Sequence, residues 1–578
     1  MNSVNAAFDQ LAELASAPRD HLKLISLLLL STPLSLLFPL MPASSPVQHL
    51  FAFVVAAIYL AVVLEMPRGF LELLISTLVT WASVRYFVAA DRTASLSANQ
   101  RDANGHAVDK ETRSDHMGGK GKAGTWPWYI FAILMGQLTL NHIHRYFSNT
   151  SLDVIEITGS QMVLVMKLSH YAWNAYDGTR PLEELDDRQK GDRITELPGL
   201  LEFLGFSFFF PSILVGPSFT FASYRAFTSR SLFASVEGKE KATALARQRL
   251  PKGRTKRALR QYCIGALYLA LYSLFAAKYS YATVVSPSMR HAGWFKTVLW
   301  MNAAGFFART KYYAVWTFAE AACIASGIAW NPRSGKYDGS RNVKIRSIEF
   351  AENFKILLDS WNMNTNVWLR ECVYKRTARK GRKPGFKSTM ATFATSALWH
   401  GININYFFTF LMGGFLQALG RQIRTTIRPF LLPAGITAVT PATSPEIGTN
   451  GFDFKKPPLR LPAPSLAKRT YDVLSIVATQ AALNYIVAPF MLLELRPTLV
   501  CWQRVGWYGH IITFVPLTFY WLGGGAFLKG QLKAREKHAA RQKGQSDRAD
   551  KRIETTIERT HEKARQPSVR DASHIPSL

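Results

Sequence analysis

The chain has 578 residues, 48% of them hydrophobic, and these fall in long blocks that are typical of a polytopic membrane protein and not of a set of soluble domains. The formal net charge of +30 suits nucleic-acid binding, but the basic clusters lie between apolar blocks, where membrane topology and anionic lipid explain them better. The four cysteines lack CxxC spacing, so neither a zinc site nor a disulfide framework is expected.

The chain begins with a polar segment, residues 1–22, that lacks the basic start and cleavage site of a secretory signal. About 20 apolar residues are needed for a helix to cross a bilayer. We predict an all-α transmembrane bundle of about 11 helices, with one or two of the blocks re-entrant or interfacial. The blocks are 23–41, 47–65, 69–90, 127–147, 155–173, 199–218, 259–285, 293–308, 311–330, 388–413, 469–495 and 507–529.

Several blocks are interrupted by Pro, Gly or charge. The blocks 293–308 and 311–330 are separated only by Arg309 and Thr310. Such breaks are tolerated where protein or a water-filled cavity surrounds them, which indicates the interior of an enzyme or transporter.

The connecting segments differ in composition. Loop 91–125 is polar and is predicted to be a disordered connector. Loop 225–258 carries ten Lys or Arg against two Glu, and 369–387 carries eight against one, so both are expected to face the cytosol. Segment 430–468 is rich in Pro, Thr and Ser and is predicted to be irregular. We therefore divide the chain into a polar segment at 1–22, a transmembrane catalytic domain at 23–529, and a charged, helix-prone, partly disordered cytosolic tail at 530–578.

His400 ends a polar stripe on a predicted helix. Thr389, Thr392, Ser396 and His400 lie at spacings of three, four and four, which places them on one helical face. A polar stripe in an apolar helix suggests the wall of an internal hydrophilic cavity. The alternative is helix–helix hydrogen bonding by the Ser and Thr hydroxyls.

Asn362 lies between Trp361 and a polar run, ahead of a second tryptophan, Trp368. An amide can donate to a developing oxyanion or orient a nucleophile without changing protonation. The basic residues that follow suit a phosphate-bearing partner such as coenzyme A or a phospholipid head group, or they only determine topology. These residues are Arg370, Lys375, Arg376, Arg379, Lys380, Arg382, Lys383 and Lys387.

A histidine and an asparagine without a Ser or Cys nucleophile at motif spacing argue against a covalent acyl-enzyme. They fit direct transfer, in which the histidine takes a proton from an attacking hydroxyl. Cys372 has no neighbour that would lower its pKa, so it is interpreted as structural.

Seven segments resemble the membrane-bound O-acyltransferase (MBOAT) family, specifically its lysophospholipid acyltransferase branch. Three of them carry the core of the resemblance: SWNMNTNVWLRECVYKR at 360–376, KPGF at 383–386 and ALWHGININYFF at 397–408. Four upstream segments support it: NHIHR at 141–145, MKLSHYAWNAYDG at 166–178, VGPSFTFASYRAF at 215–227 and EAACIASGIAWN at 320–331. The resemblance spans about residues 130–410. After WHG the chain departs from a Pro-Gly-Tyr-type continuation, although Tyr406 keeps an aromatic ring there.

The resemblance implies a bundle of about 11 helices around a catalytic chamber, with Asn362 and His400 as the catalytic pair. A long-chain acyl-CoA would enter from the cytosol and a lysophospholipid from the bilayer, so the enzyme would be a 1-acylglycerophospholipid O-acyltransferase. It would use acyl-CoA as co-substrate, with no cofactor and no metal, in the endoplasmic reticulum membrane. The residues expected to bind substrate are Trp361, Thr365, Trp368, Arg370, Tyr374, Arg376, Thr392, Ser396 and Trp399.

Three questions stay open at this point. The role of Asn362 is to orient the acceptor hydroxyl, to orient His400, or to bind the oxyanion. The acceptor is a lysophospholipid, or alternatively a diacylglycerol, a sterol or a protein. A protein that is not an enzyme, a lipid or proton transporter, is the other alternative. Membrane lipids are expected partners, nucleic acid is not, and homo-oligomerisation is left open.

Overall fold

A computed structural model describes residues 2–15, 17–103, 125–148, 154–234, 250–378, 384–432 and 465–565. Within these ranges the regular elements are all helices, and the only β pairing is one isolated bridge. The predicted all-α class is therefore confirmed. The chain forms two compact units. Of the described residues, those up to Gln417 and those of Asp472–Ile511 form the larger unit, and those of 418–432, 465–471 and 512–565 form the smaller.

The N-terminal helices follow the first apolar blocks. They are α1 (Asn2–Ala15), α2 (Arg19–Ser35), η1 (Phe38–Leu40), α3 (Pro46–Ala57), η2 (Ile58–Val63) and α4 (Pro67–Ala103). Because α4 continues to Ala103, the prediction of a disordered connector is wrong for residues 91–103, which contain no Gly or Pro to end the helix. Residues 104–124 lie outside the described residues.

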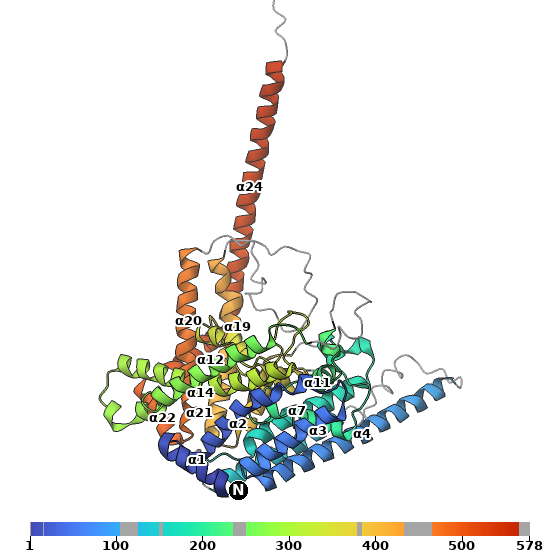
Figure 1. Cartoon of the computed structure of the whole chain (residues 1–578). Helices are drawn as coiled ribbons and strands as arrows, with labels where there is room; N and C mark the ends of the chain where they lie inside the picture. The colour runs from blue at the N-terminus through green and yellow to red at the C-terminus, as the bar shows by residue number, and fades with distance from the viewer. Residues whose placement is uncertain are drawn as a thin grey trace, which may run out of the picture. The chain divides into compact units, whose positions relative to one another are not determined.

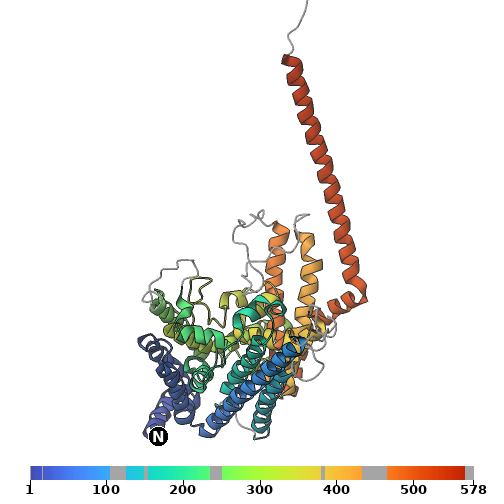
Figure 2. The ribbon, with the colours of Figure 1, turned by 90° about the vertical axis from the view of Figure 1, so that its right-hand side faces the viewer.

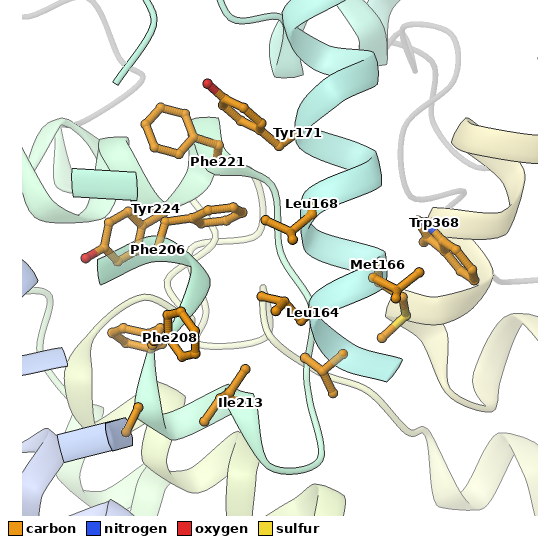
Figure 3. Packing of buried hydrophobic residues seen from close by; sticks show 14 of the residues in the cluster. Leu164, Met166, Leu168, Tyr171, Phe206, Phe208, Ile213, Phe221, Tyr224 and Trp368 are labelled. Atoms are coloured by element: carbon orange, nitrogen blue, oxygen red, sulfur yellow. The ribbon is translucent and has the colours of Figure 1, made fainter. Parts of the chain in front are cut away.

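Helix α7 (Thr158–Gly178) is buried along most of its length: 17 of its 21 residues are buried. It packs beside α4 and α6 (Trp126–Phe147), and the three helices lie side by side in Figure 2. Figure 3 shows that its two sides have different neighbours: Leu164 and Leu168 point toward Phe206 and Phe208, whereas Met166 points toward Trp368. Helix α7 is therefore a scaffold on which segments from distant parts of the sequence meet.

Lys167 on α7 stabilises a break in the predicted span at 199–218. That span consists of two short helices, α9 (Leu200–Ser207) and α10 (Phe210–Ile213). The buried Lys167 Nζ donates to the carbonyl oxygens of Phe206 (2.8 Å) and Ser207 (3.4 Å), where α9 leaves carbonyls unpaired, and it lies 4.5 Å from the centroid of the Phe219 ring. The break is thus satisfied inside the protein, as irregular backbone in a membrane protein must be.

Helix α14 (Trp294–Ser326) is a single helix of 33 residues, so the predicted break at Arg309 and Thr310 is wrong. Figure 1 shows α12 (Arg254–Phe275) lying along it. Arg309 is tolerated within α14 because its guanidinium donates to both carboxylate oxygens of Glu349, at 3.0 and 2.7 Å, and to Asn484 Oδ1 at 2.6 Å. Its charge is compensated by residues that are distant in sequence.

Replacing Arg309 with methionine is expected to destabilise the protein by about 3–5 kcal/mol, because Glu349 would keep a poorly hydrated carboxylate without its counter-ion. Unfolding of the detergent-solubilised protein measures the effect. The matched control is Arg290→Met at an exposed position, which should change stability by no more than about 0.5 kcal/mol. Equal effects of the two substitutions would contradict the structural role given to Arg309.

The remaining elements are shorter or lie further along the chain. They are η3 (Leu182–Glu184), α8 (Asp187–Asp192), α11 (Phe221–Thr228), η4 (Ser231–Phe233), α13 (Tyr281–Val285), η6 (Pro287–Met289), α15 (Ile345–Glu349), α16 (Phe354–Ser360), α17 (Met363–Leu369), η7 (Arg370–Tyr374), α18 (Phe386–His400), α19 (Ile404–Thr426), η8 (Arg428–Leu431), α20 (Leu466–Ile486), α21 (Ala488–Leu492), α22 (Leu495–Arg504), α23 (Tyr508–Phe519), η9 (Tyr520–Gly524) and α24 (Gly525–Arg565). Most of the segment predicted to be irregular at 430–468 lies outside the described residues.

Five helical stretches of the described chain are long and apolar enough to cross a membrane: Arg19–Leu40, Pro46–Val63, Pro67–Ala94, Leu466–Leu492 and Tyr508–Thr560. The predicted number of about 11 spans therefore stays a prediction. Helices α6, α7 and α14 are as long as the qualifying stretches, with 22, 21 and 33 residues, but they carry polar side chains. Such side chains are expected on helices that face other helices in place of lipid.

The helix-prone character predicted for the C-terminal tail is confirmed within the smaller unit. Helix α24 is one continuous helix, drawn in red in Figure 1. Near its start, Arg535 donates to the carbonyl oxygens of Pro429 (2.9 Å) and Leu432 (3.0 Å). The side chains described beyond residue 540 are exposed, so this part of the helix contributes no core.

Candidate active site

Asn362 is the N-cap of α17 and adopts a left-handed backbone conformation, with φ 43° and ψ 53°. Asn tolerates this conformation better than other non-glycine residues. Its side-chain Oδ1 accepts two hydrogen bonds, from Thr365 Oγ1 at 2.8 Å and from Asn342 Nδ2 at 3.1 Å. In the described chain its Nδ2 makes no hydrogen bond, and the side chain is only partly buried. The oxygen end of the amide is therefore fixed by hydrogen bonds, and the nitrogen end is free.

His400 is the last residue of α18, and aromatic rings surround its imidazole. Phe410 stacks on it with a centroid distance of 5.0 Å and an interplanar angle of 19°, and Phe490 meets it edge-on at 5.1 Å. Tyr406, the aromatic residue retained after WHG, lies 5.9 Å away. None of the described residues hydrogen-bonds His400, so its ring nitrogens are free to exchange a proton with a substrate.

One face of α7 holds both site helices in place. Met162, Met166, Ser169, Trp173 and Asp177 are spaced four, three, four and four residues apart, which places them on one face. Each is contacted by α17, by η7 and the turn after it, or by α18. The contacts are Trp399 Nε1 to Met162 O (3.0 Å), Thr365 Oγ1 to Met166 Sδ (3.2 Å), Trp368 Nε1 to Ser169 Oγ (2.8 Å), Arg376 over the Trp173 ring (4.3 Å), and Arg376 to both oxygens of Asp177 (2.9 and 2.6 Å).

These contacts bring the supports of the two predicted catalytic residues together. The residue bonded to Asn362, Thr365, is held at Met166, and the residue before His400, Trp399, is held at Met162. The two anchors are one helical turn apart, about 6 Å along the axis. The Trp368 and Trp399 rings also contact each other, with centroids 5.9 Å apart. Although Asn362 and His400 are 38 positions apart in sequence, the fold thus holds their neighbours Thr365 and Trp399 one helical turn apart on α7.

Sequence reasoning did not single out His142. On α6, its Nε2 lies 3.2 Å from the carbonyl oxygen of Trp399. This carbonyl belongs to the last turn of α18, where helices leave carbonyls unpaired. His142 therefore helps to fix the helix end that carries His400. The segment NHIHR was noted only as part of a resemblance, and nothing in its spacing predicts this contact.

Sequence reasoning also missed Asn342, which is 2% exposed and lies in the loop after α14. Its backbone oxygen accepts from Met363 N–H at 2.9 Å, and its Nδ2 donates to Asn362. Its Oδ1 accepts from the backbone N–H and the side-chain Nδ2 of Asn364, both at 3.1 Å. No periodic pattern surrounds Asn342, so the sequence carries no signal for this role.

The basic run after Asn362 enters a network of ion pairs. Lys375 Nζ contacts Asp186 Oδ2 at 2.6 Å and Glu371 Oε2 at 2.7 Å, and Arg188 lies 3.4 Å from Asp192. Burial alone would raise the pKa of Asp186, but hydrogen bonds from Lys375 and from two backbone N–H groups outweigh it, so this pKa is lowered. Burial raises the pKa of Asp192 despite the neighbouring Arg188. The charges of Lys375, Arg376 and Arg188 are thus largely neutralised by carboxylates.

Comparisons of the sequence with known families and proteins identify the family. The model of the family described as "MBOAT, membrane-bound O-acyltransferase family" matches residues 144–440, a range that includes Asn342, Asn362 and His400. The lysophospholipid acyltransferase of Schizosaccharomyces pombe is 32% identical over 521 residues, 89% of this chain and 89% of that protein.

The chain belongs to the membrane-bound O-acyltransferase family.

Two further relatives support this family membership. The lysophospholipid acyltransferase of Saccharomyces cerevisiae is 33% identical over 82% of this chain and 69% of its own length. Membrane-bound glycerophospholipid O-acyltransferase 1 of Mus musculus is 28% identical over 68% of this chain and 74% of its own. Together with the apolar helices, membership of the MBOAT family makes this chain an integral membrane protein.

In this MBOAT protein, three residues expected to bind substrate are packed as anchors. Trp368 and Trp399 are 0% and 4% exposed, and their indole N–H groups donate to α7. The two terminal nitrogens of the Arg376 guanidinium donate to Asp177, and its Nε donates to the backbone oxygen of Glu371. Arg376 is paired with Asp177, and Lys375 with Asp186 and Glu371, so their charges are balanced within the protein. Phosphate binding by these two residues stays a prediction. Both contribute to the structure of the site.

Replacing Arg376 with lysine tests whether Arg376 holds the structure together or binds a phosphate. Lysine keeps the positive charge but loses one of the two bonds to Asp177 and the stacking on Trp173, so unfolding should occur at lower temperature. The KM for acyl-CoA should stay within about threefold of the wild-type value, because no phosphate contact is lost. Enzyme kinetics and thermal unfolding of the same preparation measure both. A rise in the KM for acyl-CoA at unchanged stability would instead show that Arg376 binds a phosphate of the substrate.

Three further residues expected to bind substrate, Trp361, Arg370 and Tyr374, contact other residues of the protein. Trp361 packs against the rings of Tyr312, Tyr313 and Trp316, at 5.6, 6.0 and 5.0 Å. Arg370 Nε donates to Glu371 Oε1 at 3.1 Å, and Tyr374 OH donates to the oxygen of Pro384 at 3.4 Å. Their contacts to substrate stay predictions.

The polar stripe on α18 is present, but its threonine hydroxyls donate within the helix. Thr389 donates to the oxygen of Gly385 at 3.2 Å and Thr392 to that of Ser388 at 2.7 Å. Ser396 is buried and has no such bond. Each donation leaves the oxygen lone pairs of the hydroxyl group available, so a role in lining a cavity stays a prediction.

An apolar groove of about 880 Å³ lies along α6. Eight residues of α6 line it together with Leu398 of α18, which lies two residues before His400. Within the residues that the structure describes, no group of three or more His, Cys, Asp or Glu side chains is arranged to hold a metal ion.

Proposed function

We propose that this protein transfers a long-chain acyl group from acyl-CoA to the free hydroxyl of a lysophospholipid. The observation that carries the proposal is the pair of contacts on α7: Trp399, next to His400, is held at Met162, and Thr365, which is bonded to Asn362, is held one helical turn away at Met166. Two supporting findings are the relative of similar length named lysophospholipid acyltransferase and the apolar groove beside α18. The reaction would occur in the endoplasmic reticulum membrane, with acyl-CoA supplied from the cytosol and no cofactor.

His400 acts as the general base in the proposed mechanism. It accepts the proton of the attacking hydroxyl while the hydroxyl oxygen forms a bond to the thioester carbonyl carbon. The tetrahedral intermediate then collapses, the carbon–sulfur bond breaks, and the proton on His400 passes to the leaving thiolate. The products are a diacyl phospholipid and free CoA. Positioning contributes as well, because hydroxyl and carbonyl must be held about 3–3.5 Å apart.

Purified protein incubated with labelled oleoyl-CoA and a panel of acceptors tests the proposal. The panel contains lysophosphatidylcholine, lysophosphatidylethanolamine, lysophosphatidylserine, lysophosphatidylinositol and lysophosphatidate, with diacylglycerol and cholesterol as competitors from other acceptor classes. The expected result is a labelled diacyl phospholipid with stoichiometric release of CoA. Labelling only of diacylglycerol or cholesterol would overturn the acceptor assignment, and lipid flux without CoA release would favour a transporter.

A further inference from the structure

The direction of the hydrogen bonds around Asn362 can be read from one backbone group. An amide side chain has an oxygen that accepts and a nitrogen that donates, and the two ends are distinguished by their partners. The backbone N–H of Asn364 can only donate, and it points at the side chain of Asn342 at 3.1 Å. The atom of Asn342 that it meets is therefore the oxygen, Oδ1.

This assignment determines the next bond in the chain. With its oxygen turned to Asn364, Asn342 presents its nitrogen to Asn362, at 3.1 Å. That nitrogen donates, so the atom of Asn362 that it meets must be Oδ1. Thr365, whose hydroxyl can donate or accept, reinforces the same orientation at 2.8 Å but does not decide it. The free end of the Asn362 amide is thus Nδ2, which carries two N–H donors and no lone pair.

We infer that Asn342 is a positioning residue that holds Asn362 as a hydrogen-bond donor to the carbonyl oxygen of the acyl donor. The inference rests on the proposed acyl transfer and selects among the roles left open for Asn362. A donor bound to the oxygen of the acceptor hydroxyl would occupy a lone pair of the attacking atom and make that atom a weaker nucleophile. A donor bound to His400 would occupy the lone pair that takes the proton. A donor beside a carbonyl oxygen stabilises the charge that develops there in the transition state.

The backbone supports the same arrangement. Met363 N–H donates to the carbonyl oxygen of Asn342 at 2.9 Å, which ties the start of α17 to this loop and keeps Asn362 in its left-handed conformation. Asn342 is buried and all its side-chain hydrogen-bonding partners lie within residues 362–364. Its effect on the reaction therefore passes through Asn362.

Asn342→Asp is the decisive variant. Aspartate has nearly the same shape and still accepts from Asn364, but it cannot donate to Asn362 Oδ1. The Asn362 amide is then expected to rotate and donate Nδ2 to Asp, which withdraws the donor from the substrate. Oleoyl-CoA with the best lysophospholipid acceptor should show a kcat about 10²-fold lower, as for the loss of one oxyanion donor. Both KM values should stay within about threefold of wild type.

A double-mutant cycle separates this role from a structural one. Asn362→Gly removes the amide and suits the left-handed backbone. In that background Asn342→Asp should change kcat by less than about threefold, because the group through which it acts is gone. Asn342→Ala, which introduces no charge, should give a loss smaller than Asn342→Asp, since the freed amide samples both orientations. Equal losses with and without the Asn362 amide, or wild-type kcat in Asn342→Asp, would overturn the inference.

Wild type and His400→Ala, assayed beside these variants, distinguish the inference from the proposed function. If wild type transfers the acyl group and His400→Ala does not, normal kcat in Asn342→Asp overturns only the role of Asn342. If wild type transfers nothing to any lysophospholipid, the proposed function itself fails.

Discussion

Replacing His400 with alanine is expected to lower the rate of acyl transfer by about 10²–10⁴-fold, the usual loss for removal of a general base. Alanine leaves no group that can accept the proton of the acceptor hydroxyl. The fold should persist, because α18 is held through Trp399 by contacts to α7 and α6 that do not involve the imidazole. Turnover of labelled oleoyl-CoA by purified protein measures the effect.

A matched control is available in His291, an exposed histidine before α14. His291→Ala should keep wild-type activity, which would exclude a general effect of losing an imidazole. Thermal unfolding of His291→Ala should resemble wild type, and His400→Ala should stay folded but unfold at a lower temperature, because its ring packs against Phe410 and Phe490. Near wild-type turnover by His400→Ala would remove His400 from the mechanism, whatever the acceptor.

Replacing Asn362 with aspartate is expected to lower kcat by about 10²–10³-fold, because a carboxylate has no donor for the developing oxyanion. Aspartate tolerates the left-handed backbone at this position, so the loss should not come from strain. Asn362→Gly provides the comparison, since it removes the side chain without straining the backbone. The two variants should lose kcat to a similar extent with little change in either KM.

Asn362→Ala should behave differently from both. It removes the same amide but places a Cβ in a left-handed conformation, at a cost of about 1–2 kcal/mol. Lower stability of Asn362→Ala than of Asn362→Gly at equal activity would separate the chemical role of the side chain from its backbone role. Wild-type kcat in Asn362→Asp would contradict the donor role.

Local sequence patterns predicted which segments are helical, but not every place where helices break. The polar pair Arg309–Thr310 suggested an interruption in a region that folds as one helix, α14. Glu349 and Asn484 make the arginine compatible with that helix, and they are 40 and 175 positions away. A single sequence does not reveal partners at such distances. The apolar block 199–218 shows the opposite case: it was predicted as one continuous span, but it breaks into two short helices. The break depends on carbonyl oxygens that accept hydrogen bonds from Lys167 on α7.

The candidate catalytic pair was identifiable from motifs, whereas its supports were not. Asn362 and His400 lie in segments whose residue types suggest chemistry. Asn342 and His142 act through contacts across 20 and 257 positions and belong to no pattern. The basic run after Asn362 illustrates the converse: sequence shows its charges, but only the fold shows that Asp177 and Asp186 neutralise Arg376 and Lys375.

The number of membrane spans shows a related limit of hydropathy. Helix α7 is buried and long, yet it carries Lys167, His170 and Asp177, which lower its mean hydropathy. These side chains are buried among other helices, as polar groups in membrane proteins usually are. A helix in the centre of such a protein is thus harder to recognise from composition than one that faces lipid.

The central claim is that His400 transfers an acyl group from acyl-CoA to a lysophospholipid. The most direct measurement is the release of CoA, together with labelled phospholipid, by purified wild type and His400→Ala in parallel, with oleoyl-CoA and each lysophospholipid of the panel. We predict stoichiometric CoA and diacyl phospholipid from wild type, and at least about 10²-fold less of both from His400→Ala. Equal product from the two proteins, or no lysophospholipid acylation by wild type, would contradict it.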